Sequence, residues 1–321
     1  MSEHQSGEEL PPVAESRIAE IRRSGTWGSA LSADEFTAIR SVGFEPVGQV
    51  LGAAVYNIGY TGGWSCPGAW AGYGGFATPY QSVTAVSGTG SSIDSFGPMV
   101  QTLYQARRRA LGRMTEECAE LGGHGVVGVL LTIGQFPAGG LEFKAIGTAV
   151  RAPGGTAGAG TGGGVGTGGL KQPFTSDLSG QDFAKLIMAG WAPAGLALGI
   201  SIGARHDDWL TINQTRWGSG NAEVHGYTDL VNQARHDART QLDRDVTRIG
   251  AEGVVVKSMD MRIRERECPM QEHRRDHIAE VTIIGTAITK FGRSRPRRDG
   301  SLAILSLDPQ RRQAARVKLG R

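Results

Sequence analysis

Cysteine is scarce in this sequence, and the few cysteines follow no known framework. The 321 residues include three cysteines, Cys66, Cys118 and Cys268, and no CxxC pair. An odd number of widely separated cysteines argues against a disulfide framework and against a structural zinc knuckle. We therefore expect reduced thiols.

Motifs of catalysis are missing as well. The sequence has no HExxH motif, no paired-carboxylate motif and no Ser–His–Asp order. Two polar pairs, Ser32 with Glu35 and Ser179 with Asp182, have the spacing of a helix N-cap and its capping-box partner. The sequence therefore predicts a protein that is not an enzyme.

A secretory signal and a membrane helix are not expected either. The stretch MSEHQSGEEL lacks the apolar core of a signal and the basic character of a transit peptide. Residues 186–204 are uncharged and carry glycines four apart, which alone would suit a membrane helix. Their counterpart earlier in the chain, residues 39–57, contains Arg40 and Glu45. We predict a strand at 186–204 and a cytoplasmic protein without an integral membrane segment.

Glycine is what the sequence has in excess. There are 49 glycines, about twice the usual share. Many lie between Ala152 and Lys171, in PGGTAGAGTGGGVGTGGL, which lacks the side chains for a core and reads as a flexible linker. The predicted organisation is a polar, partly helical extension (1–28), a first domain (29–151), the linker (152–172), a second domain (173–291) and a basic tail (292–321).

The two predicted domains are copies of one pattern. Residues 29–52 align without a gap on residues 176–199. Further on, apolar residues recur with helical spacing in both copies. These are Leu103, Ala106, Ala110, Met114, Cys118 and Leu121 in the first copy and Val231, Ala234, Ala238, Leu242, Val246 and Ile249 in the second. Each copy thus contains one long amphipathic helix.

The order of elements in each copy predicts the fold class. Strand, long loop, helix, strand, hairpin and strand follow one another, with LGGHGVVGV of the first copy matching IGAEGVVVK of the second. We predict α+β architecture, with two tandem two-layer domains that each have a small antiparallel sheet and one long helix.

The glycines of LGGHGVVGV are not a phosphate-binding loop. A phosphate loop places its glycines between a strand and the following helix. Here Gly122, Gly123 and their counterpart Gly250 follow a helix, where a left-handed C-cap is favoured. His124 is replaced by Glu252 in the second copy, which argues against a metal ligand.

The first copy resembles a known family. The stretch ARRRALGRMTEECAELGGHGVVGV, followed by EFKAIGTAV, is similar to the YbjQ-like family of heavy-metal-binding domains, and the second copy is a more divergent match. The resemblance implies a dodecin-like α+β domain, and single-domain relatives that form rings of five. It provides no ligand signature that can be transferred residue by residue.

One segment has the residue types of a metal site. ECPMQEHRRDH contains Cys268, His273 and His277, and a thiolate with two imidazoles suits zinc or copper. The step of four residues would put both histidines on one face of a helix. The alternative is a solvated hairpin loop before a strand at 279–288.

An aromatic insertion distinguishes the first copy. Its extra nineteen residues include Trp64, Cys66, Trp70, Tyr73 and Phe76, separated by glycines. Aromatic side chains in a long loop need a surface to pack on, so we expect an interface or ligand contact there, or packing of the loop on its own domain.

The basic tail could attract an anionic partner. Residues 292–321 carry nine Lys and Arg against two Asp, a net charge of +7, whereas the whole chain has +3. This favours nucleic acid, an anionic membrane surface or an acidic protein patch, and a solvated tail is the alternative.

Three functions follow from these observations. The leading interpretation is a non-enzymatic, ring-forming homo-oligomer of two fused YbjQ-like domains that acts as a scaffold or small-ligand carrier. The second is a protein that binds or senses a divalent metal, zinc or copper. The third is an adaptor for membranes or nucleic acid that uses the tail.

Overall fold

The computed structural model describes residues 10–57, 84–86, 96–136, 140–152, 173–216, 220–267 and 275–290. We refer to residues 10–152 as the first half and to residues 173–290 as the second half. The elements of the first half are α1 (Pro12–Ser24), α2 (Ala33–Ser41), β1 (Glu45–Tyr56), β2 (Thr84–Val86), α3 (Gly97–Glu120), β3 (Gly125–Gln135) and β4 (Leu141–Arg151). Those of the second half are β5 (Phe174–Thr175), α4 (Gly180–Met188), β6 (Trp191–His206), α5 (Trp209–Thr215), α6 (His225–Ile249), β7 (Gly253–Glu267) and β8 (Arg275–Lys290).

The predicted α+β class and the order of elements in each half are confirmed. The first sheet has the order β1-β4-β3-β5 and the second has β2-β6-β8-β7. All pairs are antiparallel except β3 with β5. Two short strands cross between the halves, because β2 of the first half pairs with β6, and β5 of the second half pairs with β3. This exchange of strands is not visible in the sequence pattern.

The helix ends follow the predicted capping chemistry. Ser32 and Glu35 form a complete capping box at the start of α2, and the Ser179 hydroxyl accepts from the Asp182 N–H at the start of α4. Gly122 and Gly250 adopt φ values of +72° and +77° after the two long helices. Gly122 and Gly123 of LGGHGVVGV therefore lie in the turn after the helix, as predicted, whereas Gly125 and Gly128 belong to β3.

The long helices pack on their sheets through matching small residues. The predicted apolar stripes are buried except at their ends: Leu121 and Ile249 are half-buried, and Leu230 is buried in place of Val231. Gly52 of β1 lies so close to α3 that an added Cβ would be 1.9 Å from the Ala110 carbonyl oxygen, and at Gly199 of β6 it would be 2.1 Å from that of Ala238. These glycines let helix and strand approach backbone to backbone.

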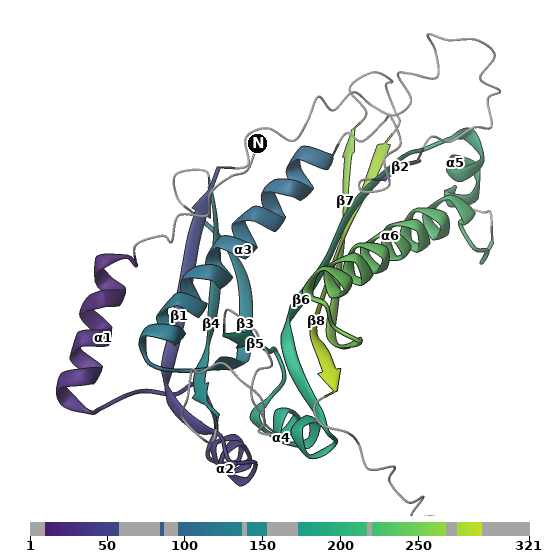
Figure 1. Cartoon of the computed structure of the whole chain (residues 1–321). Coiled ribbons are helices and arrows are strands. Elements are labelled where there is room, and N and C mark those ends of the chain that lie inside the picture. Colours follow the sequence, from purple (N-terminus) through teal and green to yellow (C-terminus); the bar gives the residue numbers. More distant parts are fainter. Residues whose placement is uncertain are drawn as a thin grey trace, which may run out of the picture.

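The two halves form successive layers. Helix α3 covers the first sheet and also faces the second sheet, whose opposite side carries α6 (Figure 1). Every residue of β6 from Leu196 to His206 is consequently buried, whereas β1 is buried on one face only. Within the described residues, no helix is both long and apolar enough to cross a membrane. The strand predicted at 186–204 begins later, because residues 186–188 still belong to α4 and β6 starts at Trp191.

Candidate functional site

The predicted metal ligands are only partly visible. Cys268 and His273 lie outside the described residues, so the structure does not bring the three ligands together or separate them. His277 lies in β8, which begins at Arg275 and not at 279. The expectation of a loop or helix at His277 is therefore wrong. The reason is that β6 extends to His206 and pairs with β8 as far as Asp276.

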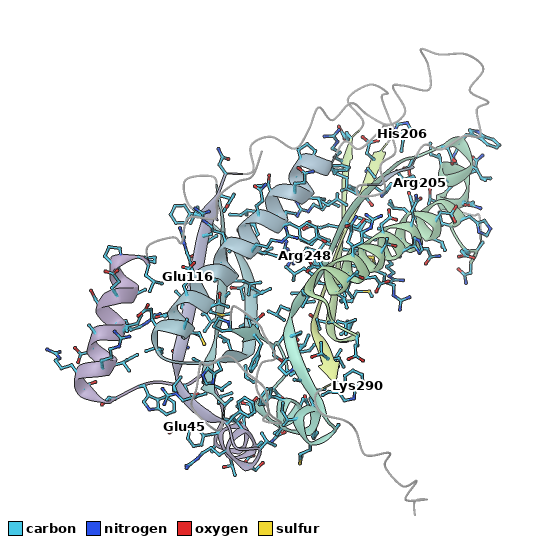
Figure 2. All side chains as sticks on the ribbon, in the orientation of Figure 1. Glu45, Glu116, Arg205, His206, Arg248 and Lys290 are labelled. Atoms are coloured by element: carbon cyan, nitrogen blue, oxygen red, sulfur yellow. The ribbon has the colours of Figure 1, made fainter. Side chains whose placement is uncertain are left out.

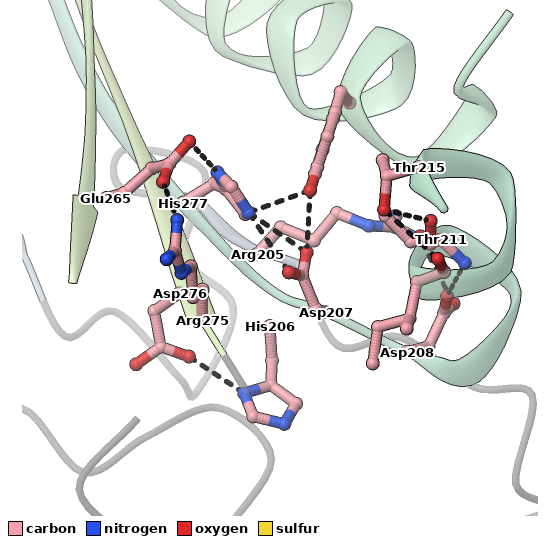
Figure 3. Close-up of polar contacts among 12 residues, drawn as sticks. Arg205, His206, Asp207, Asp208, Thr211, Thr215, Glu265, Arg275, Asp276 and His277 are labelled. Atoms are coloured by element: carbon pink, nitrogen blue, oxygen red, sulfur yellow. Dashed lines mark hydrogen bonds and ion pairs between the residues drawn. The ribbon is translucent and has the colours of Figure 1, made fainter. Parts of the chain in front are cut away.

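His277 belongs to a polar cluster at the far end of the second sheet (Figure 3). Its Nε2 lies 3.0 Å from Asp207 Oδ1 and 2.9 Å from the hydroxyl of Tyr227 on α6. The Tyr227 hydroxyl in turn donates to Asp207 at 3.2 Å, and His277 Nδ1 faces Glu265 of β7 at 3.7 Å. The imidazole is held between carboxylates from two sides.

A second histidine beside it is held in the same way. His206 Nδ1 lies 2.8 Å from Oδ1 of Asp276, whose side chain is fully buried. Arg266 Nε lies 3.6 Å from the other oxygen of Asp276. Burying a carboxylate is costly unless polar partners lie within reach, and here an imidazole and a guanidinium supply them.

This cluster has the chemistry of a closed hydrogen-bond network. Burial, followed by the nearby Asp207 carboxylate, raises the pKa of Tyr227, so its phenol remains a donor. His277 could ligate a metal through Nδ1 while Nε2 keeps its present contacts. Among the described residues, no group of three or more His, Cys, Asp or Glu side chains is placed to hold a metal ion.

Sequence reasoning missed most of this cluster. Asp207 and Tyr227 lie 70 and 50 residues from His277, so no short spacing connects them. A usable signal was the longer hairpin of the second copy. Its strands β7 and β8 have 15 and 16 residues, whereas β3 and β4 have 11 each.

Two other predicted sites lie outside the described residues. They are the aromatic insertion with Trp64, Cys66, Trp70, Tyr73 and Phe76, and the basic tail at 292–321. Cys118, a member of the predicted apolar stripe, is fully buried. His124 Nδ1 accepts from the Ala152 N–H at 3.0 Å, a structural role.

The most extensive site joins the two halves. We call residues 174–178 the second-half arm; it includes β5 and lies along the edge of β3. Ser176 donates to the Val126 carbonyl and its own carbonyl accepts from Val129, both at 2.9 Å. The arm thus extends the first sheet with backbone from the second half.

An apolar core seals this contact. It combines side chains of both halves: Ile39, Phe44, Val127, Val150 and Ala152 with Phe174, Leu178, Phe183 and Ile187. Phe174 and Phe183 stack with their ring centroids 5.9 Å apart, and Phe44 meets Phe183 edge-on at 5.1 Å. Such aromatic contacts stabilise an interface beyond the area they bury.

Helix α3 adds a polar contact between the halves. The Tyr104 hydroxyl donates to the Leu198 carbonyl at 3.2 Å and accepts from the Ile200 N–H at 2.9 Å. Beside it, Arg108 lies 3.6 Å from Asp245 of α6. A groove of about 310 Å³ runs between the two helices here, and Arg248 reaches toward it from α6 (Figure 2).

The second-half arm covers the edge of β3, but the equivalent edge of β7 in the second half is open. Val127 of β3 is fully buried under the second-half arm, whereas Val255, its counterpart on β7, is 37% exposed. Among the described residues, β7 ends its sheet without a further strand on its outer edge. Its exposed apolar side chains, the apolar strip of β7, are Val255, Val256, Met259 and Ile263.

Comparison with known proteins identifies relatives. A YbjQ family model described as "Putative heavy-metal-binding" matches residues 82–153, so the resemblance of the first half is confirmed; the match does not include the second half. The encapsulin nanocompartment protein Rv1762c of Mycobacterium tuberculosis (strain ATCC 25618 / H37Rv) is 31% identical over 253 residues, which are 77% of this chain and 81% of the relative. No solved structure matches the chain significantly.

Proposed function

Because the chain belongs to the family of the mycobacterial encapsulin nanocompartment protein and carries a YbjQ-like domain, we propose that it is a non-enzymatic protein whose copies assemble into a ring. The assembly would act in the cytoplasm as a scaffold or small-ligand carrier. The name of the relative associates it with a nanocompartment, and this supports self-assembly here.

The observation that carries the proposal is the open edge of β7. An edge strand with exposed apolar side chains is a template for pairing with another chain, and monomeric proteins usually protect such edges. Here Val255 of the apolar strip of β7 is left exposed, while its equivalent on β3, Val127, is buried under the other half. A second copy is the cover that the proposed function supplies.

The particle mass in solution tests this proposal. We expect mass photometry of the full chain at nanomolar concentration, and sedimentation at micromolar concentration, to show one species. Its mass should equal that of three or more copies of the 33.9 kDa chain. Closed symmetry predicts a single narrow peak. A monodisperse monomer at micromolar concentration would overturn the proposal.

A second candidate function is binding of zinc or copper. The family description favours it, and His277 supports it because its Nδ1 faces Glu265 next to the segment with Cys268 and His273. Metal content of the purified chain should then be stoichiometric, and should be lost in the triple variant Cys268→Ala, His273→Ala, His277→Ala. Equal metal content in parent and variant, or none in the parent, would exclude this site.

A further inference from the structure

We propose that residues 27–31 of one copy dock on the outer edge of β7 of a second copy, in the geometry that the second-half arm adopts on β3. We call residues 27–31 the first-half arm. The inference rests on the proposed self-assembly and names the two surfaces that perform it. The occupant of the open β7 edge is therefore a defined segment of an identical chain.

The two arms are held on their own halves by the same contacts. Ser29 and Thr148 hydroxyls lie 3.2 Å apart in the first half, and Ser176 and Thr286 hydroxyls lie 3.1 Å apart in the second. In both arms the N–H of the next residue also donates to that threonine, at 3.2 and 3.1 Å. Each arm is thus anchored to its own sheet and presents its other side outward.

The two arms also present the same aromatic pair. Trp27 stacks on Phe36 of α2 with ring centroids 6.2 Å apart and planes 20° apart. Phe174 stacks on Phe183 of α4 at 5.9 Å and 11°. The second pair is buried in the core between the halves, whereas both residues of the first pair are only half-buried. Trp27 and Phe36 therefore have the stacked geometry of the buried pair, but no other half covers them within the described chain.

A glycine on β7 supports this pairing. On β3, a Cβ at Gly125 would lie 2.2 Å from the ring of Phe174, so glycine is required under the arm. Its counterpart on β7 is Gly253, where the nearest heavy atom to an added Cβ is 3.7 Å away, on Ile288. Nothing within the described chain requires glycine at 253, but an indole from Trp27 of a second copy would.

The internal contact also sets the register between copies. On β3, Gly125 pairs with Phe174 and Val126 with Thr175, in parallel orientation. The equivalent pairing places Trp27 of one copy opposite Gly253 of the next and Gly28 opposite Val254. Because the arm and the β7 edge are different surfaces, the contact is head-to-tail, and its repetition closes a ring or continues as a fibre.

One part of the internal contact cannot be copied unchanged. A Cβ at Gly180 of α4 would lie 2.7 Å from Glu35 Cβ of α2. The residue equivalent to Gly180 in the first half is Ala33, which has that Cβ. The separation between α2 of one copy and α4 of the next must therefore be larger than the separation between α2 and α4 within a chain. The contact between copies then depends on the first-half arm.

Charge substitutions on either surface test the proposal. In the full chain, Trp27→Asp and Val255→Arg should each raise the concentration for half-assembly by about 30-fold or more, as expected for an interface hot spot. Ile263→Arg is the matched control, since Ile263 lies on β7 beyond the stretch equivalent to the arm contact. It should assemble like the parent.

Mixing the two variants separates loss of contact from loss of folding. Each variant keeps one intact surface, so an equimolar mixture of Trp27→Asp and Val255→Arg should form dimers of chains and nothing larger. If the parent assembles and the Trp27→Asp and Val255→Arg variants assemble just as fully, this inference is overturned but the proposed function remains intact. A monomeric parent would overturn the proposed function itself.

A disulfide checks the register directly. In a background in which Cys66 and Cys268 are serine and Cys118 is valine, single variants Gly28→Cys and Val254→Cys should cross-link to each other on oxidation after mixing, because neighbouring strands bring Cα atoms within disulfide range. Ile263→Cys replaces Val254→Cys as the control and should not cross-link. Absence of the 28–254 cross-link in assembled protein would overturn the register.

Discussion

Glu117 and Asp245 perform the same task in the two halves. Each carboxylate comes from the long helix and accepts from a backbone N–H on the outer edge of a strand, Leu51 at 2.8 Å and Leu198 at 3.0 Å. An arginine from an earlier helix also reaches each carboxylate: Arg17 of α1 bonds Glu117, and Arg108 of α3 lies 3.6 Å from Asp245. Asp245 is in addition bonded by Arg248 of its own helix at 2.7 Å. The repeat therefore extends to buried polar chemistry.

Removing the Glu117 carboxylate should destabilise the first half strongly. Glu117→Ala leaves the Leu51 N–H without its acceptor and creates a cavity, at a cost of about 2–4 kcal/mol in the free energy of unfolding. Urea denaturation at fixed protein concentration measures it. Glu120→Ala, which removes an exposed pair with Arg22, should change stability by no more than about 1 kcal/mol. Equal effects of the two substitutions would contradict this account.

The glycines beneath the helices should not tolerate a methyl group. Gly52→Ala and Gly199→Ala would each place Cβ against a helix carbonyl, at 1.9 and 2.1 Å, so helix and strand must separate. We expect a loss of about 3 kcal/mol or more, or no folded protein, by thermal denaturation. Gly112→Ala is the opposite control: nothing lies within 4 Å, and alanine in a helix should stabilise by about 0.8 kcal/mol.

Cys118 should be chemically inert in the folded protein. Burial raises the pKa of its thiol to about 12, so almost no thiolate is present at pH 8. In a background with Cys66→Ser and Cys268→Ser, iodoacetamide should leave the native chain unmodified by intact mass and label it fully in urea. Rapid labelling of the native chain would show that the α3 core opens locally.

Asp177 should make stability depend on pH in an unusual direction. Burial raises its pKa, although a hydrogen bond from Thr286 offsets part of this effect. The folded state therefore binds the proton more readily, so this contribution to stability is present at low pH and is lost as the pH rises through the raised pKa. The advantage of Asp177→Asn over the parent in the free energy of unfolding should be larger at pH 7 than at pH 4.

Asp182 provides the control of opposite sign. The Ser179 hydroxyl, followed by Lys185, lowers the pKa of Asp182. Its contribution to stability is therefore present at pH values above the ordinary pKa of an aspartate, and it is lost as the pH falls through the lowered pKa. Asp182→Asn should therefore cost more at pH 7 than at pH 4. A parallel response of the two variants to pH would show that local burial and capping do not determine these titrations.

The elements within each half could be predicted because their signals are local. The stripe through Ala110 and Met114 has helical periodicity, the capping box at Ser32 spans four residues, and Gly250 ends its helix by its own conformation. Each signal depends on neighbours within a few turns. The same holds for its counterpart in the other half.

The contacts between halves could not be predicted in the same way. Phe174 and Thr175 form a strand of two residues, which has no periodicity and exists only because the edge of β3 accepts it. The polar neighbours of His277 in the sequence predict a solvated loop. His277 lies in a strand because Asp207 and Tyr227, distant in sequence, satisfy its ring nitrogen.

The fusion of two halves also restricts which rings are possible. One of the contacts of the proposed ring, the arm on β3, is already made inside every chain. A closed ring of whole chains must therefore contain an even number of halves. The YbjQ resemblance implies a ring of five domains for single-domain relatives. Five is an odd number of domains, so a chain with two halves cannot form that ring. Five whole chains would close a ring of ten halves, wider and with two alternating kinds of junction.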